Sequence, residues 1–404
     1  MKKWVVLFLA IGFWGCNQDD EFDKIAAIEN EIEFNLSVPN DFSWSAVTQD
    51  VLLVSITSGS EKTLALDGSV MELFNEDDEL LDAMTIAKGT VCFNVRIPTV
   101  TKKLKLRTPA TNTLLEFSAL KRSLRFEIPG NFKSSKKTDT DGDGLTDEFD
   151  YAPKNPEVTL RINKNYTNKT SSYFIFEDLW PSKGDFDFND FIVKTNVSWK
   201  RGKGNYITEI SGICELQRNS SEYGLGFELF EAKGTYLIYM EDVIVDLEGA
   251  KKTELISNGF VVFDDFQEDR KITRNFTIQL KENTLTDFTL VPYLFKQANK
   301  QHQIRSFGTP PTQLQKMQMF HSMDDASPNN WQWVKGAKFK YPLAGDEAFY
   351  RTAEGHPWGV QFMAQSFIPS GEMQSILISY PQFQSWAESG GTENKDWYNH
   401  PSVK

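Results

Sequence analysis

Short runs in which apolar and polar residues alternate, separated by turns, constrain the fold of this chain most strongly. Alternation with a period of two is the pattern of a strand with one buried face. Aromatic residues, which favour strands, make up 13 % of the 404 residues. About seven such runs in one stretch suit a small β-sandwich, which we expect over residues 31–132, and the whole chain is predicted to be all-β. The clearest runs there are 31–38, 50–57, 91–97, 104–107 and 114–119.

A second region of strand-like runs extends from residue 158 to residue 404. One helix is expected at Pro381–Glu388, because Gly390 and Gly391 follow it and glycine ends helices. We therefore predict a larger C-terminal β-sandwich with a minor helix. The runs are 173–176, 191–199, 206–216, 236–240, 260–263, 272–280 and 288–295, with 376–380 as a further strand candidate.

Residues 89–98, with the sequence Gly-Thr-Val-Cys-Phe-Asn-Val-Arg-Ile-Pro, resemble the transthyretin-like sandwiches found as spacers on secreted bacterial proteins. This resemblance implies a transthyretin- or immunoglobulin-like topology for the N-terminal sandwich. Polar and basic residues at 130–138 mark the expected end of that domain.

The first fifteen residues have the features of a secretion signal. Lys2 and Lys3 precede an apolar run, residues 4–14, that is too short to span a bilayer as a helix. The run ends at Gly15-Cys16, and the chain then turns polar. The pattern resembles a bacterial lipoprotein signal, which implies cleavage before Cys16 and attachment of lipid to it. An ordinary signal peptide with an incidental cysteine is the alternative.

Residues 16–30 follow as an acidic tether. Their first part, Cys-Asn-Gln-Asp-Asp-Glu, resembles the signal that sends some Gram-negative lipoproteins to the outer face of the outer membrane. Any solvated linker has a similar composition, so both interpretations stay open. The expected location is therefore the outer membrane, with the protein exposed on the cell surface.

Residues 139–150, with the sequence Asp-Thr-Asp-Gly-Asp-Gly-Leu-Thr-Asp-Glu-Phe-Asp, form a metal-binding motif. Acidic residues at positions one, three, five, nine and twelve, with glycine at six, have the spacing of an EF-hand calcium loop. Ca²⁺ is a hard cation that prefers oxygen ligands, and alternate residues of a tight loop point inward. The predicted ligands are the carboxylates of Asp139, Asp141, Asp143, Asp147 and Asp150 and the backbone carbonyl of Leu145.

The flanks of this loop do not suit an EF-hand, which needs a helix on each side. Residues 151–157 contain two prolines, and the residues before the loop are poor helix formers. Residues 139–157 instead resemble a thrombospondin type 3 calcium repeat. A solvated acidic linker is the alternative, but carboxylates ~5 Å apart repel by about 3 kcal/mol at an effective dielectric constant near 20. Such crowding favours a bound cation.

A second motif, residues 176–193, contains Phe-Glu-Asp-Leu-Trp-Pro-Ser-Lys-Gly-Asp-Phe-Asp-Phe-Asn-Asp-Phe-Ile-Val. It resembles the signature of the LruC-domain family of Gram-negative secreted and lipid-anchored proteins. The segments 350–360 and 386–398 agree with that resemblance, which covers about residues 139–404. It implies a β-rich extracellular module and no established reaction.

The acidic residues of this motif suggest a second cation site. Asp185, Asp187 and Asn189 are expected on one side of an extended segment whose later residues, from Phe191 onward, enter a core. A rim of carboxylates that cap turns by accepting backbone N–H groups is the alternative. The candidate ligands of a second calcium ion are Glu177, Asp178, Asp185, Asp187, Asn189 and Asp190.

Several classes of function are disfavoured. The net charge of −13 argues against nucleic acid as a partner. The four histidines form no zinc motif and adjoin no nucleophile elbow, and no phosphate-binding glycine loop is present. We therefore expect a non-catalytic, calcium-binding surface lipoprotein that binds a surface protein or glycan, or assembles with one. The alternatives are a glycan-binding lipoprotein of an outer-membrane uptake system and a carboxylate-dependent glycoside hydrolase.

Overall fold

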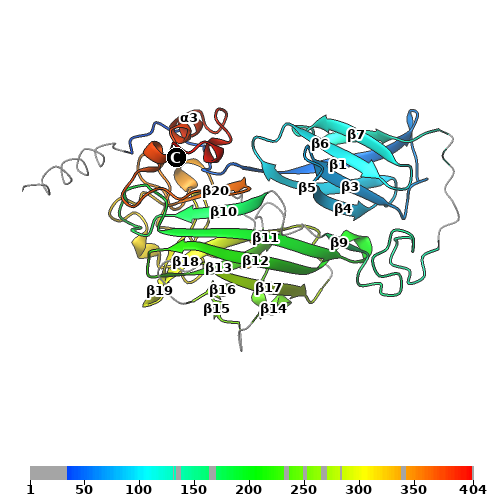
Figure 1. The fold of residues 1–404 in the computed structure, drawn as a ribbon. Coiled ribbons are helices and arrows are strands. Elements are labelled where there is room, and N and C mark those ends of the chain that lie inside the picture. The colour runs from blue at the N-terminus through cyan, green and yellow to red at the C-terminus, as the bar shows by residue number, and fades with distance from the viewer. Residues whose placement is uncertain are drawn as a thin grey trace, which may run out of the picture.

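The computed structural model describes most of the chain beyond the tether and confirms an all-β fold. Two β-sandwiches lie side by side, with the acidic loop beside both of them (Figure 1). The predicted signal segment 1–15 and Cys16 lie outside the described residues. No helix among the described residues is long and apolar enough to cross a membrane. The described residues are 34–130, 132, 138–162, 170–231, 236–248, 253–264, 271–282, 284–337 and 343–402.

The N-terminal sandwich packs two four-stranded sheets around one apolar core. Strand β1 is central in the first sheet, with β2 and β5 antiparallel to it and β8 parallel to it. The second sheet has the order β4-β3-β6-β7. Leu52, Phe93, Leu106 and Phe126 are fully buried between the sheets. The strands are β1 (Val47–Ser58), β2 (Glu61–Lys62), β3 (Val70–Asn75), β4 (Leu80–Thr85), β5 (Thr90–Pro98), β6 (Lys103–Thr108), β7 (Thr113–Ser118) and β8 (Ser123–Glu127).

The C-terminal sandwich packs a seven-stranded sheet against a five-stranded one. The larger sheet has the order β14-β17-β12-β11-β10-β20, and β9 pairs with β11 beside this path. Its strands are β9 (Leu160–Ile162), β10 (Ser171–Phe176), β11 (Phe191–Arg201), β12 (Ile207–Asn219), β14 (Val243–Leu247), β17 (Ile272–Leu280) and β20 (Gly359–Ala364). The smaller sheet comprises β15 (Leu255–Ile256), β16 (Gly259–Phe263), β13 (Tyr223–Glu231), β18 (Phe288–Lys296) and β19 (Asn299–Ile304).

Strand β13 lies inside the smaller sheet and was not predicted from the sequence. Eight of its nine residues are buried, so its sequence shows no alternation. Two glycines also weaken its strand signal, yet both have a packing reason. A Cβ on Gly226 would lie 2.3 Å from the ring of Tyr293, and one on Gly224 would lie 2.4 Å from the ring of Phe295.

The predicted strand at 31–38 is wrong for its described part. Residues 34–38 have no regular secondary structure and pack on the C-terminal domain rather than in the N-terminal sandwich. Phe34 and Leu36 are buried there, and Phe34 stacks on Phe186 at a centroid distance of 4.2 Å. The alternating pattern therefore reflects contact with a distant surface, not pairing in a sheet. We call residues 34–46 the strap.

The strap covers the outer face of the larger C-terminal sheet together with two short helices, α2 (Ile376–Ser379) and α3 (Gln382–Glu388). Its Trp44 donates a hydrogen bond from Nε1 to the carbonyl oxygen of Gly355 at 2.9 Å. Figure 1 shows the first described residues beside α3 and the C-terminus. The strap therefore packs as part of the C-terminal domain. In the sequence, the N-terminal sandwich is inserted between the strap and the rest of that domain.

Two smaller predictions also differ from the structure. Residues 236–240 form no strand; they lead into a 3-10 helix at Met240–Asp242. The strand candidate 376–380 is helix α2, whose Ser375 side chain accepts a hydrogen bond from the Leu377 N–H. The predicted helix at 381–388 is confirmed as α3, with Pro381 as its N-cap.

Candidate metal sites

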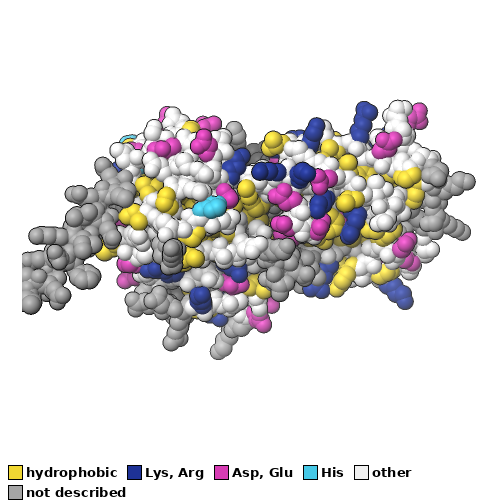
Figure 2. Space-filling view, turned by 45° about the horizontal axis from the view of Figure 1, so that its top comes forward, with side chains coloured by type: hydrophobic (Ala, Val, Ile, Leu, Met, Phe, Trp, Pro, Cys, Tyr) yellow, Lys and Arg dark blue, Asp and Glu magenta, His cyan; other side chains and the backbone are white. Residues whose placement is uncertain are grey.

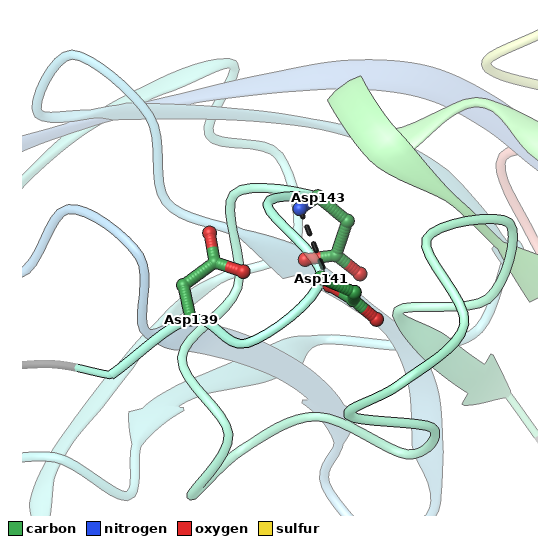
Figure 3. Close-up of side chains that lie close together, drawn as sticks. All are labelled: Asp139, Asp141 and Asp143. Atoms are coloured by element: carbon green, nitrogen blue, oxygen red, sulfur yellow. Dashed lines mark hydrogen bonds between the residues drawn. The ribbon is translucent and has the colours of Figure 1, made fainter.

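The acidic loop turns sharply, and the described residues after it, 151–157, form no helix. Gly142 and Gly144 have φ angles of 75° and 102°, a left-handed conformation that glycine adopts without steric cost. Figure 3 shows the carboxylates of Asp139, Asp141 and Asp143 directed toward one another. Each offers an oxygen within 4.8 Å of the others, so the first three predicted ligands converge.

Three buried oxygens at this point have no hydrogen-bond partner. They are the Oδ2 atoms of Asp141, Asp143 and Asp150. Burial raises the pKa of Asp150 to about 6, and the neighbouring carboxylates add to the effect. A buried, unpartnered carboxylate oxygen is costly. The donor set of hard oxygens fits Ca²⁺, and these residues occupy positions three, five and twelve of the predicted loop.

Asp147, the predicted ligand at position nine, is not brought to this group. Its two carboxylate oxygens accept hydrogen bonds from Thr140, one from the backbone N–H at 2.8 Å and one from Oγ1 at 2.7 Å. These hydrogen bonds lower the pKa of Asp147. Asp147 therefore closes the loop rather than facing its centre. For Leu145, the structure shows a fully buried side chain and a backbone N–H bonded to Asp143.

The loop is wedged between the two sandwiches. Leu145 packs in one apolar cluster that draws Val70 and Ala83 from the N-terminal sandwich and Leu160 and Ile162 from the C-terminal one. On the same loop, the Thr146 N–H donates to the Gly68 carbonyl at 3.0 Å, and Lys203 Nζ donates to the Gly142 carbonyl at 2.9 Å. The candidate calcium loop thus contacts both domains directly.

The second acidic group lies where β10 ends and β11 begins. Glu177, Asp185 and Asp187 each offer an oxygen within 4.8 Å of the others. The expectation that this segment is extended is wrong, because Phe186 and Phe188 have left-handed φ angles of 54° and 52°. Both rings are buried under the strap, and this packing overrides the preference of bulky residues for extended backbone.

Hydrogen bonds hold this group in place. Glu177 Oε1 accepts from the Phe188 N–H at 2.6 Å, and Asp187 accepts from the N–H groups of Asn189 at 2.9 Å and Met373 at 3.1 Å. Asn189 is fully buried, and its Oδ1 has no partner. A Cβ on Gly184 would lie 2.0 Å from Glu177, so glycine leaves room for the carboxylate. The group combines turn capping with one buried oxygen, Asn189 Oδ1, that has no partner.

Burial and like charge raise the pKa values of the carboxyl groups in the second group. Burial, reinforced by the charge of Asp187, raises the pKa of Glu177 well above its usual range. Burial, reinforced by the charge of Asp185, raises the pKa of Asp187 to about 8. The remaining candidates form an adjacent pair, in which the Asp178 N–H donates to Asp190 at 3.0 Å. Burial raises the pKa of Asp190 to about 7.

Sequence reasoning missed the distant loops that close around this second group. One of these loops contains Met373. Another contains Asp324, whose carboxylate accepts a hydrogen bond from the Lys183 backbone N–H at 2.8 Å. Trp180 Nε1 donates to Asp325 at 2.8 Å. The two residues of each pair lie more than a hundred residues apart in the chain. No local sequence pattern predicts such contacts.

The described cysteines and histidines offer little chemistry. Cys92 is exposed and Cys214 is buried, and they form no disulfide with each other. Burial lowers the pKa of His302 to about 4, so its ring is neutral near neutral pH. Burial also lowers the pKa of His356, whose ring nitrogen lies 3.1 Å from the Leu36 carbonyl in the strap. His356 thus serves the packing of the strap.

Comparison with protein families finds a match within the C-terminal domain. Residues 205–398 match the family described as a domain of unknown function, DUF4842. The match lies within the predicted C-terminal domain and excludes both acidic groups. No curated protein matches the chain significantly.

Solved structures show the fold. A protein from Bacteroides ovatus that is described as a lipoprotein is 13 % identical, with a TM-score of 0.50, over 83 % of this chain and 98 % of that one. A DUF3823 family protein from the same species is 11 % identical over 62 % of this chain and 93 % of that one, but its TM-score is 0.16. The first shares the overall fold; the second is too dissimilar to inform it.

Proposed function

We propose that this protein is a lipid-anchored cell-surface protein in which calcium holds two sandwiches in one arrangement, and that it acts as a non-catalytic binding or assembly module. The observation that carries this proposal is the set of buried, unpartnered carboxylate oxygens in Asp141, Asp143 and Asp150. They lie in a loop that contacts both domains. The second acidic group is proposed as a further calcium site, with Glu177, Asp185 and Asp187 as its core.

The resemblances found in the sequence support this proposal. Residues 139–157 resemble a thrombospondin type 3 calcium repeat, and among the described residues that follow the loop, 151–157 form no helix. The LruC-like segment 176–193 supplies the second acidic group. Both resemblances belong to extracellular proteins, where calcium is abundant enough to fill sites of modest affinity.

The anchor is proposed at Cys16, from which the tether would lead to the strap. Residues 17–33, even fully extended, reach roughly 60 Å. They lead into the strap, which lies on the C-terminal domain beside α3. In this proposal the C-terminal domain, on which the strap lies, is the part of the molecule that the tether reaches first along the chain. The similar fold of a Bacteroides protein described as a lipoprotein agrees with this proposal.

A non-catalytic role is supported by the number of carboxylates that converge in each acidic group. Glycoside hydrolases use a pair of carboxyl groups. In both acidic groups three carboxylates each offer an oxygen within 4.8 Å of the others, which suits a shared cation. Figure 2 shows acidic and basic side chains interspersed over the N-terminal sandwich, so the face in view offers no basic surface for nucleic acid.

Calcium titration calorimetry combined with limited proteolysis tests the proposal. We expect binding at the loop, with protection of residues 134–155 that is lost in EDTA. The physical reason is that calcium stabilises the folded loop by RT ln(1 + [Ca²⁺]/Kd), about 2.7 kcal/mol at a hundredfold excess over Kd. Asp141→Ala combined with Asp143→Ala should reproduce the effect of EDTA. Glu148→Ala, which removes an exposed charge from the same loop, is the control. Unchanged cleavage without any heat of binding would reduce the loop to an acidic linker.

Anchoring has its own test. Cys16→Ala should move the protein from the membrane fraction to the soluble fraction, because the lipid has no other attachment point in the proposal. Cys92→Ala, at an exposed cysteine, is the matched control and should leave fractionation unchanged. Complete shielding of the unmodified protein from protease added to intact cells would contradict surface exposure.

A further inference from the structure

Three large apolar side chains project into solvent from loops that meet at the second acidic group. Leu179, Met323 and Met373 are 56 %, 80 % and 59 % exposed. Leu179 lies in the loop between β10 and β11, Met323 in a loop between β19 and β20, and Met373 shortly before α2. Single exposed apolar residues are ordinary, but several gathered at one place indicate an interaction surface.

Hydrogen bonds hold these three loops together. Ser182 Oγ donates to Met323 Sδ at 3.2 Å, and the Ser182 N–H donates to the Leu179 carbonyl at 2.9 Å within one turn. The Met373 N–H donates to Asp187 at 3.1 Å. The three apolar residues are therefore fixed to the loop between β10 and β11, which carries the acidic group.

Two of these residues have a backbone conformation that bulky side chains rarely adopt. Met323 and Met373 have left-handed φ angles of 52° and 58°. Phe186 and Phe188 share this conformation, but their rings are buried under the strap, which offsets the strain. The exposed methionines gain no such burial. Strain of this kind is concentrated at functional sites, so their exposure points to a contact outside the chain.

The acidic group between these loops is open on one side. Glu177 and Asp187 are buried, whereas Asp185 is exposed. Lys183 of the same loop is paired with Glu354 at 3.1 Å. Without a cation, the three carboxylates repel an approaching anion. Ca²⁺ takes six to eight oxygens, so an ion held from the buried side keeps coordination positions free for a phosphate oxygen on the open side.

A buried polar atom supports a cation at this group. The side-chain amide of Asn189 lies against Asp187, with 2.5 Å between Nδ2 and Oδ2. Asn189 is fully buried, and its Oδ1 has no partner. A hard cation satisfies such an oxygen together with the neighbouring carboxylates.

This surface lies at the end of the molecule where the tether joins the structure. Phe34, the first described residue of the strap, stacks on Phe186, which stands between two of the acidic residues. The far end of β11, at Arg201, contacts the N-terminal sandwich, so that sandwich begins roughly 33 Å away along the strand (Figure 1). Residues 17–33 reach roughly 60 Å from Cys16. An anchored chain therefore keeps this surface close to the lipid at a high effective concentration.

We propose that the second acidic group and the rim of Leu179, Met323 and Met373 form a membrane-docking surface. Calcium in the acidic group bridges to lipid phosphate groups, and the three apolar side chains enter the interface between headgroups and acyl chains. The inference rests on the calcium role proposed for this group and adds its partner. A lipid surface matches both parts, because it offers phosphate oxygens to the cation and apolar chains to the rim.

Vesicle co-sedimentation tests this inference on the full chain with Cys16→Ala, which removes the proposed attachment point of lipid. The vesicles contain phosphatidylcholine with or without phosphatidylglycerol. We expect binding to the anionic vesicles in calcium, and its loss in EDTA or without phosphatidylglycerol. Combining Leu179→Ser, Met323→Ser and Met373→Ser should weaken binding about tenfold or more, because apolar area no longer enters the lipid. Calcium affinity and thermal unfolding of this triple variant should not change, since the three side chains are exposed.

Leu114→Ser combined with Leu120→Ser is the matched control. These residues are 59 % and 79 % exposed, but they lie in the N-terminal sandwich, so vesicle binding should not change. Calorimetry separates the two proposals: if Asp185→Asn with Asp187→Asn leaves the number of bound calcium ions unchanged, the calcium role itself fails. Calcium binding without vesicle binding overturns membrane docking alone. Binding that persists in EDTA, equal binding by the triple variant, or calcium-dependent dimerisation through this surface instead of vesicle binding would also overturn it.

Discussion

At the scale of single residues, the carboxyl groups of the two acidic sites link stability to pH in an unusual direction. Burial raises the pKa of Asp150 to about 6 and that of Asp187 to about 8. In the unfolded chain both lie near 3.9. Between these values the folded protein binds more protons than the unfolded chain, so without calcium the free energy of unfolding falls as pH rises. A bound cation removes this penalty because it stabilises the ionised form.

We therefore expect that thermal unfolding in EDTA occurs at a higher temperature near pH 5 than near pH 8, and that excess calcium reduces or reverses this difference. Differential scanning calorimetry over that range checks it. Asp150→Asn should flatten the slope measured in EDTA. Asp246→Asn, which removes the same charge from an exposed strand position, should not. An identical pH dependence with and without calcium would show that these carboxyl groups do not face a cation.

The structure brings together Asp139, Asp141 and Asp143, which the sequence spacing had grouped, whereas the shape of the second acidic group follows from the sequence only in part. The spacing of acidic residues and glycine is a local pattern, so Asp139, Asp141, Asp143 and Asp150 could be assigned together. The orientation of Asp147 depends on a hydrogen bond to Thr140 that spacing does not reveal. The second group depends on packing between distant segments, and a period-two pattern cannot indicate left-handed backbone.

At the scale of elements, the strap is the segment whose role the sequence concealed. Trp44 is 1 % exposed, packs against Phe383 in α3 and bonds to Gly355. Strands with one buried face, such as β1 and β5, were predicted because alternation reports burial directly. The same signal in the strap reported burial against another domain. Periodicity indicates which side chains are buried, but it does not indicate which part of the molecule buries them.

Truncation of the strap tryptophan should destabilise the C-terminal domain specifically. Trp44→Ala removes a fully buried ring and a hydrogen bond, and we expect a cost of about 3–5 kcal/mol. Hydrogen exchange should show lost protection in α3 and β20, with β6 and β7 unaffected. Leu120→Ala, at a site 79 % exposed in the N-terminal sandwich, should change stability by less than about 0.5 kcal/mol. Loss of protection confined to the N-terminal sandwich would contradict the placement of the strap.

At the scale of the whole molecule, the two sandwiches are joined by a buried polar contact as well as by the acidic loop. Arg201, at the end of β11, donates from Nη2 to Asp82 of β4 at 2.8 Å, and both side chains are almost fully buried. Beside this pair, the Asn205 side chain donates to the Thr85 carbonyl at 3.0 Å and accepts from the Thr85 N–H at 2.8 Å. The sequence predicted two sandwiches and a loop. It did not predict these contacts between the domains, because the residues that form them lie more than a hundred positions apart in the chain.

Replacing only one residue of the Arg201–Asp82 pair should lower the free energy of unfolding more than replacing both. Burial raises the pKa of Asp82 against the opposing effect of Arg201, so each charge depends on the other. Asp82→Leu or Arg201→Met alone leaves one buried charge unpaired, at a cost of about 3–5 kcal/mol, whereas the double substitution should recover much of that loss. Chemical denaturation of the four proteins gives the coupling energy, and small-angle scattering in calcium should show a more extended molecule for each single variant. Lys103→Met with Glu116→Leu, an exposed pair within the N-terminal sandwich, is the control and should show little coupling. Strictly additive costs would mean that Arg201 and Asp82 do not act as a pair that holds the domains together.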